Sequence, residues 1–247
     1  MKLRYVALNI EPHQYSGFFN EQFIFEFNKS TEFIRNYISK AIRKFNYQTD
    51  GTFNMLLINL CVENGGCNIL RAFSTLQIRL VVLPDEVESY LKMTDLTAKY
   101  EYYLSLLERG YQQANIFRPI PIKELLEIHQ QFRKQGYKNE WLFKKVRIAP
   151  YNMILYFKCY FTISEFRLEL EAYDIKTKNL MSTGIIKKTF PDELCFAKSF
   201  KKIIIENNML TILDFLSKPA FEINLDKIRQ GIFNVNDIEG LWWNKNS

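Results

Sequence analysis

The segment from Met153 to Glu171, MILYFKCYFTISEFRLELE, decides the fold class. From Met153 to Ile163 every second residue is large and apolar, and the alternation resumes from Phe166 to Glu171. A period of two is typical of β-strands with one buried face, because successive side chains point to opposite faces of a sheet. Residues 177–179 have turn chemistry, and a further strand is expected over 180–189. The sequence therefore predicts an antiparallel meander in this half of the chain.

Two consecutive helices are predicted upstream of the meander. Aromatic and aliphatic residues recur at helical spacing between residues 95 and 114. A second helix begins at Pro121, which suits a first helical turn, and ends before Gly136. His129 falls on the apolar face of this second helix. We therefore expect a packed imidazole with one satisfied nitrogen.

The first 45 residues predict two strands followed by a helix. Residues 2–9 alternate in hydrophobicity, and Phe23, Phe25 and Phe27 alternate with polar neighbours in the same way. Ser30 and Thr31 are suitable N-caps for a helix that continues to Phe45. This helix has the clearest amphipathic pattern in the first third of the chain.

Turn residues divide the remaining elements. The apolar run 53–62 precedes Asn64-Gly65-Gly66, which indicates a hairpin whose return strand lies within 69–83. Pro84 then suits the start of a short helix. Helical sequence is expected from Pro191 towards Leu216, with a break near Asn207-Asn208, and a last edge strand is expected from Phe221 to Leu225.

The predicted fold class is α+β, with antiparallel sheets from the N- and C-terminal segments, a central helix pair and further packing helices. A chain of 247 residues without a linker or repeat is compatible with one core. We therefore expect a single domain over 1–247, with possible sub-halves 1–93 and 140–247 joined by the helices of 95–135.

The charge permits an anionic partner without requiring one. Formal charge is +6, from 33 basic and 27 acidic residues, and the pI is near 9.0. The polar side of the helix over 31–45 collects the candidate partner-binding residues Arg35, Lys40, Arg43 and Lys44. A second basic cluster comprises Lys187, Lys188, Lys198, Lys201 and Lys202. A nucleic-acid-binding or regulatory protein that uses the basic helix face is therefore one alternative function.

The sequence contains no recognisable catalytic, metal or nucleotide motif. Its histidines are His13, in a predicted loop, and His129. The spacing of Cys61 and Cys67 is outside that of usual zinc pairs, and Gly65-Gly66 has neither the lysine of a phosphate loop nor a dinucleotide pattern. We expect a binding protein that is not an enzyme and has no metal or other cofactor. An enzyme site assembled from scattered Asp, Glu, Lys and Tyr remains a further alternative.

Cysteine usage and the apolar runs bear on the compartment. All four cysteines, at 61, 67, 159 and 195, are expected to be reduced and buried. The first residues resemble no signal peptide, and no run approaches the ~18 apolar residues of a membrane span. We therefore expect a cytoplasmic protein, monomeric or weakly dimeric, without membrane contact. Trp242 and Trp243 either dock on the sheet or provide an anchor for a partner.

Two segments carry a resemblance to a known class of protein. Residues 102–110, YYLSLLERG, and residues 136–145, GYKNEWLFKK, resemble the middle of bacterial immunity proteins from polymorphic-toxin systems. In that class a helix pair leads through such a segment into an antiparallel sheet. The resemblance implies stoichiometric neutralisation of a cognate toxin by covering its active or entry surface. Immunity proteins against nucleases are frequently acidic, and the +6 charge departs from that pattern.

Overall fold

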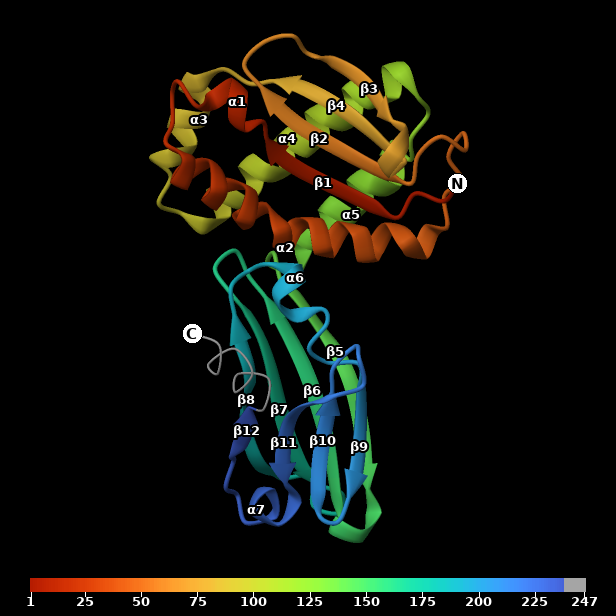
Figure 1. The fold of residues 1–247 in the computed structure, drawn as a ribbon, viewed down its shortest axis with the longest axis vertical. Helices are drawn as coiled ribbons and strands as arrows, with labels where there is room; N and C mark the ends of the chain where they lie inside the picture. The colour runs from red at the N-terminus through yellow and green to blue at the C-terminus, as the bar shows by residue number, and fades with distance from the viewer. Residues whose placement is uncertain (238–247) are drawn as a thin grey trace. The chain divides into compact units, whose positions relative to one another are not determined.

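The chain folds as two compact units, Met1–Lys138 and Asn139–Ser247, in a computed structural model that describes residues 1–237. The α+β class is confirmed, since helices and sheets are both abundant (Figure 1). The helices over 95–135, expected to join two sub-halves, belong to the first unit. We describe each unit separately.

Unit 1 contains a four-stranded mixed sheet with the order β1-β2-β4-β3. Strands β1 (Tyr5–Ile10), β2 (Met55–Cys61) and β4 (Thr75–Val81) are parallel, whereas β3 (Gly66–Leu70) pairs antiparallel with β4. The expected hairpin at residues 64–66 is wrong, because β2 has β1 and β4 as neighbours. Its nearly continuous apolar sequence is typical of a central parallel strand, and none of its residues is exposed.

Aliphatic residues cross this sheet in three aligned rows. The rows are Val6–Leu56–Leu76, Leu8–Ile58–Ile78 and Ile10–Leu60–Leu80, and every member is buried. Helix α4 (Leu96–Phe117) lies over β4, and its Gly110 faces Ile58 so closely that an added Cβ would lie 2.5 Å from the Ile58 side chain. A glycine at this position therefore allows the helix to approach the sheet.

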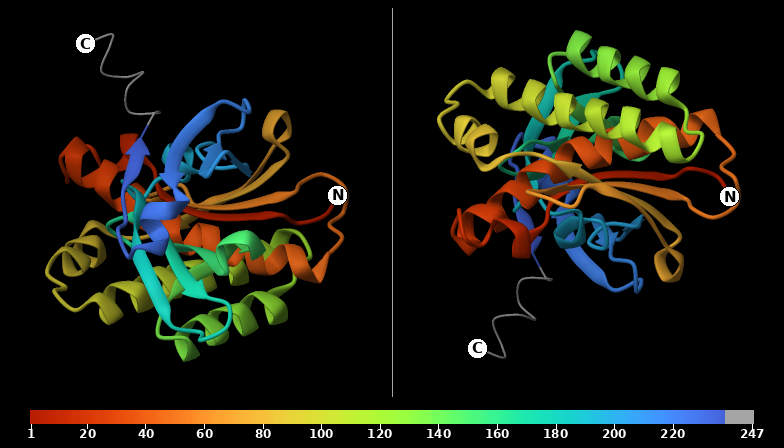
Figure 2. Two further views of the ribbon diagram at one scale, coloured as in Figure 1. Left: turned by 90° about the horizontal axis from the view of Figure 1, so that it is seen from below. Right: turned by 90° about the horizontal axis from the view of Figure 1, so that it is seen from above.

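The helices of unit 1 pack on the sheet and on one another. Helix α2 (Glu21–Phe45) packs on β1, and α5 (Ile122–Lys134) contacts both α2 and α4 (Leu96–Phe117). Helices α4 and α5 run side by side (Figure 2). The short elements are α1 (Pro12–Tyr15), η1 (Arg71–Phe73) and α3 (Pro84–Leu91). The central helix pair and the short helix at Pro84 were predicted correctly, and Gly136 adopts the positive φ of 65° expected after a helix.

Helix α2 begins ten residues earlier than the sequence pattern indicated. The side chain of Asn20 accepts a hydrogen bond from the backbone N–H of Phe23 at 2.7 Å and caps the helix. The strand expected over 23–27 is therefore wrong. Phe27 is buried and Phe25 is 56% exposed, because residues two positions apart lie on opposite sides of a helix. Thr31, expected as an N-cap, lies inside the helix, and its hydroxyl donates to the Leu8 carbonyl at 2.8 Å.

Unit 2 contains two four-stranded antiparallel sheets. The first follows chain order, with β5 (Asn139–Ile148), β6 (Met153–Phe161), β7 (Phe166–Asp174) and β8 (Leu180–Thr189). This is the predicted meander with one further strand, β5. The second sheet, ordered β12-β11-β10-β9, comprises β9 (Lys202–Glu206), β10 (Met209–Leu213), β11 (Pro219–Asn224) and β12 (Val235–Asp237). The remaining elements are η2 (Ala149–Tyr151), α6 (Glu193–Phe196) and α7 (Leu225–Arg229).

The helix expected from residue 191 to 216 is wrong beyond α6. Asn207 and Asn208 have φ angles of 46° and 66°, a left-handed pair that connects β9 to β10. Two consecutive positive φ angles are characteristic of a tight hairpin turn, which asparagine tolerates better than most residues. Strand β11 pairs on both sides, so the predicted strand exists but is not an edge.

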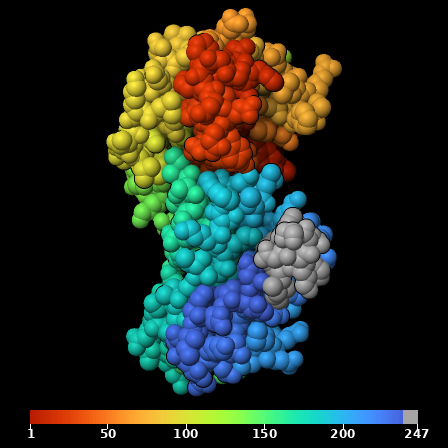
Figure 3. All heavy atoms as spheres, turned by 60° about the vertical axis from the view of Figure 1, so that its left-hand side comes forward, coloured from red at the N-terminus to blue at the C-terminus, as the bar shows by residue number. Residues whose placement is uncertain are grey.

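The two sheets of unit 2 lie face to face (Figure 1). In Figure 3 the blue atoms of the C-terminal strands lie directly against the green and cyan atoms of the same unit. The inward residues of β6 and β7, such as Phe157 and Leu168, are fully buried. At one end, the ring of Phe166 stacks on Phe196 of α6 with centroids 3.7 Å apart. Aromatic packing thus closes this end of the sandwich.

The cysteines differ in environment from the expectation. All four are free, and Cys61 and Cys159 are buried as predicted. Cys67 is only partly buried, and Cys195 on α6 is exposed. Cys195 belongs to a four-residue helix at the surface of the sandwich, where half of the positions face solvent. The expectation that all four are buried is therefore wrong.

Candidate functional site

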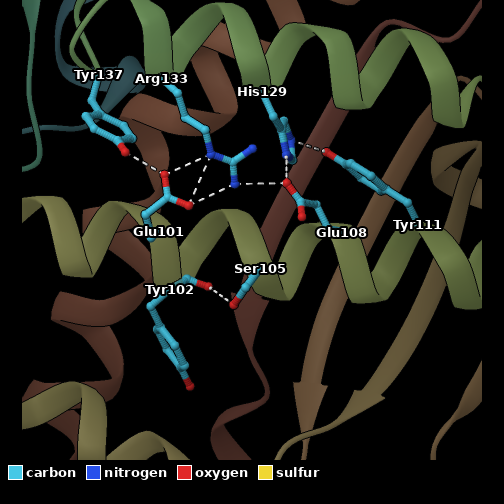
Figure 4. Close-up of polar contacts among 8 residues, drawn as sticks. All are labelled: Glu101, Tyr102, Ser105, Glu108, Tyr111, His129, Arg133 and Tyr137. Carbon is cyan, nitrogen blue, oxygen red and sulfur yellow. Dashed lines mark hydrogen bonds and ion pairs between the residues drawn. The ribbon is translucent and has the colours of Figure 1, made fainter.

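A chain of polar side chains links α4 and α5 in unit 1 (Figure 4). Arg133 forms a two-pronged contact with Glu101, with Nε–Oε1 and Nη2–Oε2 distances of 2.9 and 2.8 Å. The same Nη2 donates to Glu108 Oε1 at 3.1 Å, so one guanidinium holds two carboxylates. Tyr137 donates its hydroxyl to Glu101 at 2.5 Å. We call Glu101, Glu108, Tyr111, His129, Arg133 and Tyr137 the α4–α5 network.

His129 lies at the buried end of the α4–α5 network and is 0% exposed. Its Nδ1 is 3.0 Å from Glu108 Oε1, and its Nε2 is 3.2 Å from the hydroxyl of the buried Tyr111. In the neutral ring, Nδ1–H donates to the carboxylate and the tyrosine hydroxyl donates to Nε2. The packed histidine was predicted correctly, but both nitrogens are satisfied instead of one.

The electrostatics of the α4–α5 network favour a structural role. Hydrogen bonding to Arg133 lowers the pKa of Glu101, and hydrogen bonding to His129 lowers the pKa of Glu108. Burial raises the pKa of Tyr111. Each carboxylate is therefore held ionised by a partner in the network, and the imidazole has no solvent-facing nitrogen. Such an arrangement fixes the two helices against each other.

A different kind of surface lies on unit 2. We define the outer face as the face of the β5–β8 sheet that points away from the β9–β12 sheet. Its members on the two central strands are Ile154, Tyr156, Lys158 and Tyr160 of β6 and Arg167, Glu169, Glu171 and Tyr173 of β7. Lys145 of β5 lies opposite Tyr156, and Arg147 lies opposite Ile154. The pairing therefore places aromatic and basic side chains next to one another.

The charges of the outer face are only partly compensated. Lys158 bonds Glu171 at 2.6 Å, and Arg167 contacts Glu169 at 3.0 Å. The Nζ of Lys145 lies 5.2 Å from the centroid of the Tyr156 ring. Among residues 1–237, neither Lys145 nor Arg147 forms an ion pair with a carboxylate. The part of the β5 edge around Lys145 and Arg147 therefore carries positive charge that is free to meet an acidic partner, whereas Glu140 lies further along the same edge, opposite Tyr160.

The outer face is hollowed beside this edge. A cavity of about 470 Å³ is lined by Lys145, Ile154, Tyr156, Lys158, Glu171, Tyr173, Asp174 and Lys178. The rings of Tyr156 and Tyr173 meet edge to face at 5.6 Å and form its aromatic wall. Backbone hydrogen bonds, first that from Thr177, lower the pKa of Asp174, and the two bonds measure 2.7 and 2.8 Å. Asp174 is thus committed to the β7–β8 turn, whereas Lys178 adds a cation that forms no ion pair within residues 1–237.

The four basic residues singled out on α2 do not form one patch. Arg35 is paired with Glu32 on the same helix at 2.7 Å, and Lys40 is half-buried. Arg43 stacks on Tyr5, with its Cζ 4.9 Å from the ring centroid, while Lys44 is exposed. A span of ten residues on a helix turns these side chains in several directions. The structure brings Arg43 together with residues near the N-terminus, which the sequence pattern did not indicate.

The second basic cluster is also dispersed. Lys187 points towards the second sheet and bonds Ser199 at 2.6 Å, whereas Lys188 pairs with Glu165 at 2.8 Å on the other side of β8. Lys198 lies over the ring of Phe215. Adjacent residues of a strand face opposite sides of a sheet, so neighbouring lysines in the sequence need not share a surface.

Other candidate chemistry is limited in the described part of the chain. His13 is exposed in α1, where a loop was expected. No group of three or more His, Cys, Asp and Glu within residues 1–237 is arranged to hold a metal ion. Within the same range, no helix combines the length and apolarity needed to cross a bilayer. Trp242 and Trp243 lie outside the described residues.

No protein-family model, curated protein or solved structure matches this chain. The outer face of unit 2 is therefore defined by geometry alone. Sequence reasoning missed it as a site, although its signal was present in the same alternation that predicted the strands. The polar and aromatic half of that alternation, Tyr156, Lys158 and Tyr160 on β6, is the outer face. The pairing with β5 and β7, which completes it, is not readable from one strand.

Proposed function

We propose that this protein is an immunity protein that binds and neutralises a cognate bacterial toxin domain, and that the outer face of unit 2 contacts the toxin. The observation that carries the proposal is the combination of Tyr156 and Tyr173 with Lys145, Arg147 and Lys178 on one sheet face. The resemblance of residues 102–110 and 136–145 to immunity proteins supports the same function.

The outer face has the properties of a protein-binding surface. Tyrosine contributes a large contact area with little loss of side-chain entropy, and such residues dominate binding energies. Four strands of nine to ten residues cover roughly 15–20 by 30 Å at the usual strand spacing and rise. This flat area of roughly 450–600 Å² covers more than half of a standard interface of about 800 Å² per partner. A sheet face is also rigid, so little ordering is needed on binding.

The charge on the outer face indicates which kind of partner surface would bind there. The cations along β5 and the β7–β8 turn have no carboxylate partner among residues 1–237, so an acidic surface would complement them. We therefore propose that the toxin presents acidic groups around an aromatic-binding depression. Opposite charges would accelerate association more than they would increase affinity.

Co-expression with the toxin domain encoded beside this gene tests the proposal. We expect rescue of growth and a co-purifying 1:1 complex. Tyr156→Ala should weaken the complex by more than about 1 kcal/mol, mainly by faster dissociation, because an anchoring ring is lost. Lys145→Glu should slow association at low salt, and the difference should shrink at high salt.

A charge reversal elsewhere on unit 2 serves as the control, because it shows how much binding changes when net charge alone is altered. Lys202→Glu changes an exposed lysine on the opposite sheet of unit 2 and should leave both rate constants unchanged. A double reversal of Arg43 and Lys44 tests the helix face that the sequence pattern favoured. Equal effects of Lys145→Glu and Lys202→Glu would contradict the proposed surface. Absence of both rescue and complex, together with salt-sensitive binding to generic DNA or RNA, would favour the nucleic-acid alternative.

A further inference from the structure

A small basic pocket forms where the C-terminal end of α2 meets the segment leading into β1. It has a volume of about 270 Å³ and is lined by Lys2, Leu3, Arg4, Tyr5, Arg43 and Asn46. Three of these six residues are cationic and none is acidic. The buried Leu3 supplies an apolar base. All residues that line the pocket belong to unit 1, and none of them belongs to the outer face of unit 2.

The backbone around the pocket is fixed by hydrogen bonds. Leu3 donates to the Tyr47 carbonyl at 3.0 Å, and Arg4 donates to the Asn54 carbonyl at 2.8 Å. Asn46 ends α2 in a left-handed conformation with φ 52°. These contacts hold the leading segment beside the end of the helix, so the pocket does not depend on a loose terminus.

Arg43 is oriented by two contacts that leave its outer nitrogens available. Its Nε donates to the Arg4 carbonyl at 3.2 Å, and its guanidinium stacks on Tyr5 at 4.9 Å. No hydrogen-bond partner of its two terminal nitrogens, or of the Arg4 guanidinium, occurs in the described part of the chain. The hydrogen bond to Arg4 and the stacking on Tyr5 fix the orientation of the Arg43 guanidinium. Its free terminal N–H groups are therefore suited to two-pronged binding of an oxyanion.

Lys2 completes the cationic wall. Its Nζ donates to Asn46 Oδ1 at 2.8 Å, which uses one of its three donors and points the ammonium group across the end of α2. Lys2, Arg4 and Arg43 therefore concentrate three positive charges around one small volume. The C-terminal end of α2 offsets part of this charge through its partial negative dipole. With no carboxylate in the lining, a bound anion or ions from solution must balance the rest.

We infer that this pocket is a binding site for the phosphate group of a phosphate monoester, with Arg43 as the principal ligand and Arg4 and Lys2 as supporting cations. A monoester is close to a dianion at neutral pH and matches a compact cluster of three cations. The backbone of a nucleic acid carries one charge per phosphate and is bound by basic stripes or grooves. The Tyr5 ring is partly covered by Arg43 and does not offer a free face for stacking a base on that side.

Titration with inorganic phosphate at constant ionic strength, followed by NMR, tests the site. We expect saturable shifts of the Arg43 Nε–H signal and of the backbone signals of residues 2–5, with chloride as the control anion. Arg43→Ala should weaken binding about tenfold or more, the loss expected for one charge-assisted pair. Arg43→Lys should restore only part of it, because an ammonium group cannot bind in two prongs.

Lys44→Ala is the matched control, since Lys44 is the next residue of α2, is exposed and does not line the pocket. It should bind phosphate as the unaltered protein does. Equal weakening in Arg43→Ala and Lys44→Ala, or shifts that do not saturate, would overturn the site. Should Arg43→Ala fail to fold, the Nε–H shift in the unaltered protein decides the question alone. Tighter binding of a short oligothymidylate than of a phosphorylated sugar, with the same Arg43 shift, would overturn the assignment to a monoester.

Discussion

His129 illustrates how a residue that looks reactive in a sequence becomes structural in the fold. Its two nitrogens are bonded to Glu108 and Tyr111, and the imidazole is fully buried. The helical spacing of α5 was sufficient to predict burial. The bonding partners come from α4 and could not be predicted, because they depend on which residues of a second helix face the first.

The carboxylates of the α4–α5 network predict an acid-sensitive stability. Hydrogen-bond partners lower the folded pKa of Glu101 and Glu108, whereas the unfolded pKa of a glutamate is ~4.3. Their contribution is therefore present above that pH and is lost as the pH falls through the folded pKa values. We expect the unfolding free energy, measured with urea from pH 7 to pH 3, to decline below about pH 4.3.

A double variant tests whether the α4–α5 network, and not other acidic groups, causes the loss of stability in acid. Glu101→Gln with Glu108→Gln should flatten the acid limb and lower stability at pH 7. Glu127→Gln alters an exposed glutamate of α5 that has no side-chain partner among residues 1–237, and should retain the full slope. The ion pair of Arg133 and Glu101 is partly exposed and contributes little. The loss at pH 7 should therefore be about 1–3 kcal/mol and should come mainly from the lost contact of Glu108 with the buried His129. An unchanged slope in the double variant would contradict the assignment.

At the scale of elements, the sequence predicted helices and strands correctly where the hydrophobic pattern is long and fits only one of the two spacings. Strands β6 and β7 alternate over nine residues each, and the helical repeat of α4 covers 22. Prediction failed where a short hydrophobic pattern fits both the two-residue spacing of a strand and the 3.6-residue spacing of a helix. Phe23 and Phe27 are two alternating positions of a strand and also one turn of a helix, and the cap at Asn20 decides for the helix. Parallel pairing of β2 with β4 was not predictable, because it joins strands separated by β3.

The β9–β10 hairpin is an element whose turn residues can be tested directly. Asn207 has φ 46°, a conformation that costs most residues about 1–2 kcal/mol and glycine almost nothing. Asn207→Ala should therefore destabilise the protein by about 1 kcal/mol, whereas Asn207→Gly should be neutral or slightly stabilising. Urea unfolding of the two variants provides the measurement. Equal stability of the alanine and glycine variants would show that a helix-compatible turn forms here instead.

At the scale of the whole molecule, each compact unit has its own core and its own tightly packed glycine. Gly110 of α4 faces Ile58 in unit 1, and Gly184 of β8 faces Phe233 in unit 2. An added Cβ would lie 2.5 Å from Ile58 in the first case and 2.1 Å from the Phe233 ring in the second. Both distances require the surroundings to shift. Gly110 is buried and Gly184 is half-buried, so the two positions provide one packing perturbation in each unit.

Gly110→Ala and Gly184→Ala should each destabilise by about 1–3 kcal/mol, the usual cost of overpacking. If each unit unfolds as its own cooperative element, calorimetry of the full chain should show two transitions, and each substitution should lower the midpoint of one. Amide exchange assigns the transitions, since Gly110→Ala should accelerate exchange in β2 and α4 but not in β6 and β7. A single transition lowered by both substitutions would mean that the two cores unfold together. In that case the boundary at Lys138 separates two compactly packed units that nevertheless unfold in one cooperative transition.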